Sequence, residues 1–159
     1  MIIDGKKEAE VLREEIKKEI ISIKNKTNKS PALTVILVGD FAPSQIYVKN
    51  KEKISKEVGI NSNVIKYPKD VSEEEILKKI KELNNDKNVS GILVQLPLPD
   101  QISKEKVINL IDPLKDVDGF SPINAGNLAS GYNAIVPCTP LGCLLLLKKV
   151  EKNLSGKHA

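Results

Sequence analysis

The sequence predicts an α/β fold: a three-layer α/β/α domain with a mostly parallel sheet. Three β-prone segments, at residues 33–38, 63–67 and 91–96, alternate with segments whose apolar residues recur at helical spacing. The first and third, LTVILV and GILVQL, are almost continuously apolar, which is typical of strands covered by helices on both faces. Such strand–helix alternation implies right-handed crossovers and parallel pairing.

Helix boundaries follow from apolar spacing and from residues that start or stop a helix. A long amphipathic helix is predicted over residues 5–25, where apolar and charged residues are interleaved. A second helix should open near Pro43 and stop at Gly59, because glycine adopts a left-handed cap without a Cβ clash. A third begins with the capping-box pattern of Ser72 and Glu75.

The last third of the chain differs from the rest in composition and in the periodicity of its apolar residues. Residues 103–110 predict a short helix and residues 140–150 a final one. Between them, residues 112–140 are rich in Pro, Gly, Asn and Asp and lack sustained periodicity. We expect this segment to be irregular and to carry function, as long surface loops often do.

Size and charge exclude several classes of protein. With 159 residues, of which 40% are hydrophobic, the chain can form one ordinary core. The net charge of +4 comes from 25 Lys and Arg against 21 Asp and Glu, and the two signs are interleaved. Aromatic residues make up only 3%. Nucleic-acid binding is therefore not expected, since no basic patch with interleaved aromatics is present.

Neither a membrane segment nor a metal site is expected. The sequence begins with MIIDGKKEAE, whose apolar stretch is too short for a signal peptide. The apolar run at 141–147 is far shorter than the roughly 18 residues that are needed to span a bilayer. We expect a cytoplasmic protein without a membrane partner. Cys138 and Cys143 lack a CxxC spacing and a nearby His or carboxylate cluster, so we expect reduced packing residues and no bound metal.

Candidate site residues follow from the rule that ligands of open α/β sheets bind beyond the carboxyl ends of the strands. That rule nominates the segments after Val38 and Val94 and the loop near Asp118. Tyr47 and Lys51 are four residues apart on the predicted second helix, so they share a face. A lysine at the edge of a core is suited to proton transfer, although an ordinary surface pair has the same spacing.

Other polar residues in these segments have more than one interpretation. Gln95 interrupts an apolar run, so a buried amide here must find hydrogen-bond partners, whether in a site, in the core or at a sheet edge. Asp116 and Asp118 fit a turn closed by Gly119 and also an acid/base pair. The only histidine, His158, is next to the last residue, which weighs against histidine chemistry. No GxGxxG or Walker loop is present.

Three segments together resemble one known family. They are VGDFAPSQIYVKNKEK, which contains Ser44, Tyr47, Val48 and Lys51; GILVQLPLP; and DPLKDVDGFSPINAGNL, followed by PCTPLG. In this order and spacing they resemble the signatures of the methylenetetrahydrofolate dehydrogenase/methenyltetrahydrofolate cyclohydrolase family. The resemblance covers essentially the whole chain and implies the fold of that family's catalytic domain.

The resemblance implies a function in one-carbon metabolism. Enzymes of this family oxidise 5,10-methylenetetrahydrofolate with NADP and hydrolyse the methenyl product to 10-formyltetrahydrofolate. By resemblance, Lys51 is the acid/base or electrostatic group, Tyr47 orients it and packs along the folate rings, and Gln95 holds the lysine. Asp118 would bind the N–H groups of the pterin. The implied substrate-binding residues are Tyr47, Val48, Lys49, Asn50, Lys51, Val94, Gln95, Leu96, Pro97 and Asp118.

The resemblance also implies a domain division. Residues 1–139 would form the folate-binding catalytic domain, residues 140–150 a connecting helix, and residues 151–159 the start of a truncated NADP-binding Rossmann domain. NADP would then bind only to a full-length parent protein, and no cofactor-binding residue is expected within this chain. The full-length parent is expected to be a homodimer. Two alternatives remain open: a folate-binding or dimer-forming module without catalysis, and an unrelated nucleotide-binding α/β domain.

Overall fold

Three parallel strands and six helices make up the computed structural model, which describes residues 2–158. The strands are β1 (Ala32–Val38), β2 (Asn61–Tyr67) and β3 (Gly91–Val94). The helices are α1 (Gly5–Thr27), α2 (Ala42–Val58), α3 (Glu73–Asn85), α4 (Lys104–Leu110), α5 (Pro122–Ala129) and α6 (Cys138–Val150). The α/β class and the alternation of elements predicted from the sequence are confirmed.

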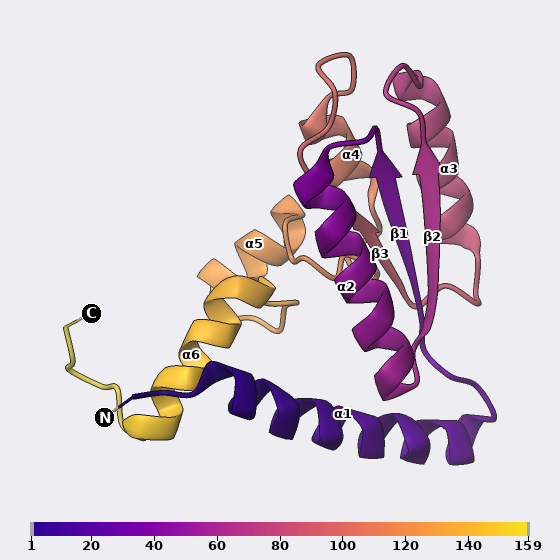
Figure 1. Ribbon diagram of the computed structural model, residues 1–159. Coiled ribbons are helices and arrows are strands. Elements are labelled where there is room, and N and C mark those ends of the chain that lie inside the picture. The colour runs from indigo at the N-terminus through magenta and orange to yellow at the C-terminus, as the bar shows by residue number, and fades with distance from the viewer. Residues whose placement is uncertain (1, 159) are drawn as a thin grey trace.

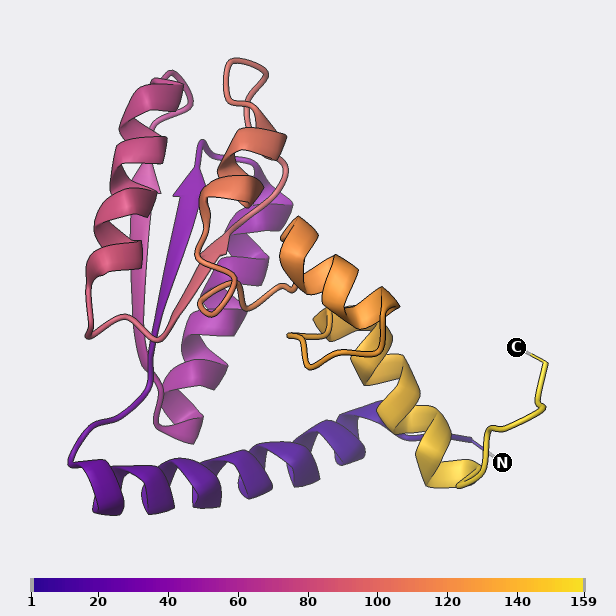
Figure 2. The same ribbon diagram turned by 180° about the vertical axis from the view of Figure 1, so that it is seen from behind.

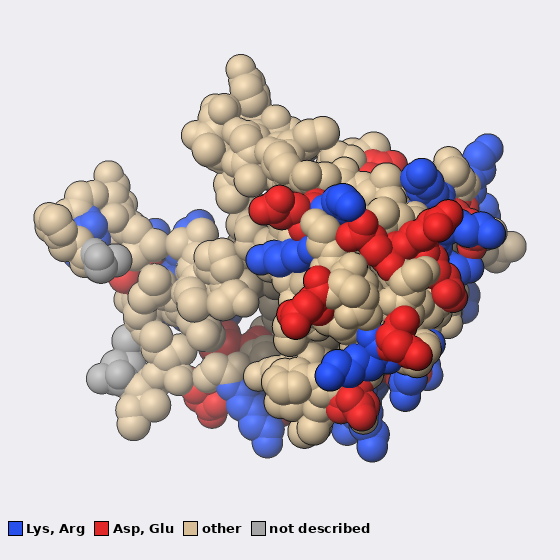
Figure 3. All heavy atoms as spheres, turned by 90° about the horizontal axis from the view of Figure 1, so that it is seen from above, with Lys and Arg blue, Asp and Glu red and all other residues tan. Residues whose placement is uncertain are grey.

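The sheet has the order β2-β1-β3, and both pairings are parallel. Helix α2 covers one face, whereas α3 and α4 cover the other, so the two views of the molecule show three layers (Figures 1 and 2). The central strand β1 is buried from Thr34 to Val38, as expected for a strand between two helical layers. All three strands end at the same edge of the sheet, at the top of Figure 1. Figure 3 shows the molecule from this end, with Lys and Arg side chains interspersed with Asp and Glu.

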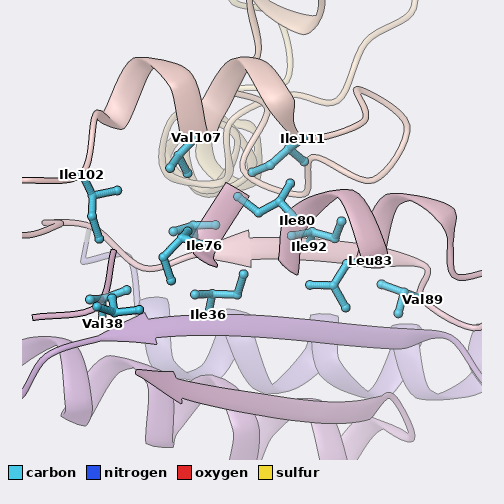
Figure 4. Packing of buried hydrophobic residues seen from close by; sticks show 12 residues of the cluster. Ile36, Val38, Ile76, Ile80, Leu83, Val89, Ile92, Ile102, Val107 and Ile111 are labelled. Atoms are coloured by element: carbon cyan, nitrogen blue, oxygen red, sulfur yellow. The ribbon is translucent and has the colours of Figure 1, made fainter. Parts of the chain in front are cut away.

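The larger part of the core lies between the sheet and the layer formed by α3 and α4. Ile36, Ile76, Ile80, Ile92 and Val107 are fully shielded from solvent and belong to one cluster (Figure 4). A smaller cluster on the opposite face joins α2 to the sheet through Val35, Leu37, Val48 and Leu93. Successive residues of β1 thus alternate between the two clusters, as the period of a strand requires.

The predicted helix boundaries agree closely with the caps that form. Helix α2 ends at Gly59, whose φ of +96° is left-handed. The Oγ of Ser72 accepts a hydrogen bond of 3.2 Å from the N–H of Glu75, so the predicted start of α3 is confirmed. Helix α6 begins at Cys138, two residues earlier than predicted.

Three expectations from the sequence were wrong. The segment 112–140 is not irregular throughout, because Ser121 caps the eight-residue helix α5. Strand β3 ends at Val94, so the last two residues of the predicted strand lie beyond it. Both cysteines are free, as expected, but Cys138 and Cys143 are exposed and are not packing residues.

Helices α1 and α6 cross at the end of the molecule remote from the carboxyl ends of the strands (Figures 1 and 2). The Nζ of Lys149 lies 2.9 Å from a carboxylate oxygen of Glu8 and joins the two helices. Among residues 2–158, no helix is long and apolar enough to cross a bilayer. The division of the chain at residues 139 and 150 stays a prediction. Ala159, which belongs to its last segment, lies outside the described residues.

We predict that Ile80→Ala lowers the free energy of unfolding by about 2–5 kcal/mol, because it leaves a cavity between α3 and the sheet. Urea denaturation of the 159-residue chain measures this loss. Ile46→Ala is the control: Ile46 is 61% exposed, so it should cost no more than about 0.5 kcal/mol. Equal effects of the two substitutions, or a melt without a cooperative transition, would contradict the proposed core.

Candidate active site

The carboxyl ends of β1 and β3 lie side by side because the two strands are parallel and in register from Leu33 and Gly91 to Ile36 and Val94. The N–H of Gln95 donates to the carbonyl of Ile36 at 2.9 Å, so the ladder continues one residue beyond β3. This bond fixes the backbone of Gln95 at the edge where ligands of α/β folds bind.

The side chain of Gln95 connects β3 to helix α2. Its Nε2 donates to the carbonyl of Leu96 at 2.8 Å, and its Oε1 accepts from the Nζ of Lys51 at 3.2 Å. A carbonyl cannot donate to an amide oxygen, so the Leu96 carbonyl determines which way the amide points. The amide oxygen is left facing the lysine.

Helix α2 reaches this edge through its first turns. Ser44 is 3% exposed, and its Oγ donates to the carbonyl of Leu96 at 3.4 Å. Val48, one turn later, packs against the sheet at 3% exposure. Lys51 is half-buried and follows Val48 by three residues, which places its amine over the end of β3. The buried face of α2 therefore sets the position of the lysine.

Asp118 approaches the same place from the segment after α4. It lies in a turn in which the N–H of Gly119 donates to the carbonyl of Asp116 at 3.2 Å. Burial raises the pKa of Asp118 above its ordinary value, whereas the charge of Lys51 opposes this shift and that of Asp116 adds to it. Burial thus favours the neutral form of this carboxyl, and the charge of Lys51 favours its ionised form.

Gly119 is required at the end of this turn. Its φ is +66°, and a Cβ built there would lie 2.4 Å from the carbonyl oxygen of Ile135. The turn bearing Asp118 packs directly against the backbone before α6, and this close approach leaves no space for a side chain at Gly119.

The structure brings together only some of the predicted site residues. Lys51 and Gln95 are hydrogen-bonded, Asp118 is electrostatically coupled to Lys51, and Tyr47 lies on the same helix with 62% of its surface exposed. Lys49 and Asn50 are exposed, and across residues 2–158 neither forms a hydrogen bond through its side chain. The side chain of Val48 points into the core instead of toward solvent.

The implied substrate-binding residues at and after the end of β3 do not line a single hollow. Val94 and Leu96 line a space of about 10 Å³ beside Asp118 and Phe120, which is too small for a pterin. Pro97 lines a separate hollow of about 220 Å³ with Gly39, Phe41 and Lys69. The folate-binding residues named from the sequence thus stay a prediction.

Three residues were not selected from the sequence as members of the site. Ser44 lies in the first signature and donates a hydrogen bond to the carbonyl of Leu96. Asp116, at the start of the turn that carries Asp118, is buried and hydrogen-bonded to the buried Asn124. The sequence signal that could have identified them is a polar side chain at the start of a helix or in a turn. Among residues 2–158, no group of three or more His, Cys, Asp or Glu side chains could hold a metal ion.

We predict that Lys51→Met raises the pKa of Asp118 further, because the positive charge that opposes the effect of burial is removed. Carboxyl-carbon NMR titration of the 159-residue chain measures this shift. Lys53→Met is the matched control, since Lys53 lies on the same helix with a side chain 74% exposed and an ion pair to Glu57. An unchanged titration of Asp118 in Lys51→Met would show that the charge of Lys51 does not act on this carboxyl.

Comparison with known proteins gives a consistent result. Residues 3–118 match the family model of the tetrahydrofolate dehydrogenase/cyclohydrolase catalytic domain. Over 159 residues the chain is 61% identical to the bifunctional protein FolD of Pelagibacter ubique, covering 100% of this chain and 57% of that protein. It is 52% identical over 159 residues to FolD of Rickettsia bellii, covering 99% of this chain and 56% of that protein.

Solved structures agree with these relatives. The bifunctional enzyme FolD of Campylobacter jejuni superposes with a TM-score of 0.95 at 46% identity, covering 99% of this chain and 56% of that one. The Trypanosoma brucei dehydrogenase-cyclohydrolase, complexed with NADP cofactor and inhibitor, gives 0.93 at 31% identity, covering 99% and 54%. The chain spans about half the length of the relatives it matches. It belongs to the tetrahydrofolate dehydrogenase/cyclohydrolase family, of which it contains the catalytic domain.

Proposed function

We propose that this chain binds tetrahydrofolates and hydrolyses 5,10-methenyltetrahydrofolate to 10-formyltetrahydrofolate in one-carbon metabolism. The observation that supports this most is the hydrogen bond that holds the lysine amine to the amide of Gln95, with the charge of that amine acting on the carboxyl of Asp118. As part of a full-length protein, the same residues would also bind 5,10-methylenetetrahydrofolate for oxidation with NADP. We further propose that the full-length protein is a homodimer, as its family resemblance implies, and that it is cytoplasmic.

The proposed hydrolysis requires a proton to move at two points. The methenyl substrate is a cationic amidinium, whose one-carbon centre is attacked by water. A C–O bond forms and the water oxygen loses a proton. The bond between that carbon and N5 then breaks as the carbinol hydroxyl loses its proton to form the formyl C=O. N5 takes up a proton, and the formyl group stays on N10. Substrate cation and water thus give neutral product and one proton, so a group that accepts and returns a proton accelerates both steps.

Lys51 is the group best placed for this role. Its amine faces the ligand-binding edge of the sheet, and Gln95 Oε1 accepts one of its hydrogens. An uncharged amine accepts a proton from water, and an ammonium can return it to N5 or to the carbinol intermediate. Arginine keeps its charge and so cannot exchange the proton. Tyr47 is exposed on the same face of α2, where its ring can pack along the substrate.

Asp118 would bind the pterin. When ionised, its carboxylate accepts hydrogen bonds from the ring N–H and amino groups, and such charge-assisted bonds are shorter and stronger than neutral ones. Partial burial strengthens this pairing because water competes less. In this arrangement Asp118 determines where the substrate lies, and Lys51 acts at its one-carbon centre.

Residues 2–158 do not fit NADP. A dinucleotide site of a Rossmann domain has a glycine-rich loop between a strand and a helix. The segments after β1, β2 and β3 contain no such loop in this part of the chain. We therefore assign no step to the cofactor and propose that it binds to the part of the longer relatives that this chain does not match.

A second candidate function is folate binding without catalysis. The observation that favours it is the exposure of the site to solvent: 62% of the surface of Tyr47 is exposed. Water that is not excluded weakens electrostatic catalysis. Binding of a tetrahydrofolate without hydrolysis of the methenyl cation above its uncatalysed rate would select this alternative.

We predict that Lys51→Met and Lys51→Arg abolish hydrolysis of 5,10-methenyltetrahydrofolate by this chain, because neither side chain exchanges a proton readily. Loss of the methenyl absorbance measures the rate, and calorimetry measures binding. Affinity should stay within about tenfold, equivalent to ~1.4 kcal/mol. Lys53→Met, on the exposed side of α2, should hydrolyse like the unmodified chain. Near-normal hydrolysis by Lys51→Met would remove the lysine from the mechanism.

We predict that Asp118→Ala weakens tetrahydrofolate binding by about 1–3 kcal/mol, because the N–H donors of the pterin lose their partner. The rate at saturating substrate should change much less, since the pterin is remote from the one-carbon centre. Titration of affinity and of the saturated rate separates the two effects. A collapse of the saturated rate with unchanged affinity would instead assign proton transfer to Asp118.

A further inference from the structure

Asp116 is a buried carboxylate to which the proposed reaction gives no role. It is 3% exposed, and no ion pair to it forms among the residues described. Its Oδ2 accepts hydrogen bonds from the N–H of Ser121 at 2.7 Å and from the Nδ2 of Asn124 at 3.1 Å. A buried carboxylate with only neutral donors is costly. The structure must therefore gain something from its position.

Asn124 links this carboxylate to three parts of the chain. It is 5% exposed, and its Nδ2 donates to the carbonyl of Pro113 at 2.9 Å as well as to Asp116. Its Oδ1 accepts from the N–H of Ile135 at 3.3 Å. One amide thus ties the segment before the Asp118 turn to α5 and to the segment before α6.

The Asp118 turn lies between these fixed points. On one side, the N–H of Ile92 in β3 donates to the carbonyl of Lys115 at 2.7 Å, and Ile92 forms a parallel bridge with Asp116. On the other side, the backbone of Gly119 packs against the carbonyl of Ile135. Because both ends of the turn are held, the direction in which the carboxyl of Asp118 can point is restricted.

We propose that Asp116 and Asn124 are positioning residues that hold the 116–119 turn so that Asp118 faces Lys51 and the ligand between them. This inference rests on the proposed function, because it deepens the role given to Asp118. The two residues act beneath the turn through hydrogen bonds to backbone and to each other. The alternative is that they only stabilise the fold.

The first test follows the position of Asp118 without any ligand. Asn124→Ala changes no charge, so a shift in the carboxyl-carbon NMR titration of Asp118 reports a change in its surroundings. We expect its pKa to fall toward the ordinary aspartate value, because a released turn exposes the carboxyl to water. Asn127→Ala is the control on the same helix, since the Asn127 side chain forms no hydrogen bond in the described chain.

The second test uses binding of 5-formyltetrahydrofolate, a chemically stable probe, to the 159-residue chain. Asp116→Ala should weaken binding at least tenfold, since both hydrogen bonds to the carboxylate are lost. Asp116→Asn should stay within about threefold of the unmodified chain, because the amide oxygen can accept both bonds. A residue that served only to stabilise the fold would lower the melting temperature without this contrast in affinity.

Each outcome bears on one of the two proposals. If the unmodified chain does not bind the probe, the proposed function fails, and the titration of Asp118 still tests positioning. If Asn124→Ala leaves that titration unchanged in a folded chain, the positioning role is excluded. Equal affinities of Asp116→Ala and the unmodified chain would also exclude it. If Asp116→Ala does not fold, Asn124→Ala takes its place in the binding test, with the same tenfold loss expected.

Discussion

The parallel register of β1 and β3 is the constraint on which the site depends. Ile36 pairs with Val94, and the N–H of Gln95 continues the ladder to the carbonyl of Ile36. This pairing places Gln95 beneath α2, within reach of Lys51, although the two residues are 44 positions apart in sequence. The buried clusters on both faces of β1 hold the register, because a slip by one residue would turn each apolar side chain to the wrong layer.

Strand β3 also connects the lysine to Asp118. Its Ile92 pairs with β1 on one side and bridges to Asp116 on the other, so the sheet supports both Gln95 and the turn that follows Asp116. The amide of Gln95 and the carboxylate of Asp116 perform similar tasks at two positions. Each is a polar group, buried or half-buried, that is oriented by backbone atoms. Gln95 holds Lys51 directly, and we propose that Asp116 holds the turn that carries Asp118.

The sequence predicted those features whose causes are local. Strand composition, the Gly59 cap and the Ser72 cap depend on a few adjacent residues, and all three were confirmed. Helix α5 was missed because its Asn- and Gly-containing sequence lacks an apolar stripe and its stability comes from contacts of Asn124 with distant segments. The role of Asp116 was equally invisible, since a turn aspartate and a buried aspartate have the same local pattern.

The claim that Lys51 and Asp118 serve one ligand is tested most directly by a crystal structure of this chain with bound 5-formyltetrahydrofolate. We predict that pterin N–H groups lie within about 2.7–3.2 Å of the Asp118 carboxylate and that the one-carbon substituent lies beside the amine of Lys51. A hollow of about 390 Å³ between α1 and α6, lined by Ala9, Leu12 and Leu145 among others, offers a competing location. Folate bound in that hollow, or with its pterin away from Asp118, would show that Lys51 and Asp118 do not serve one ligand.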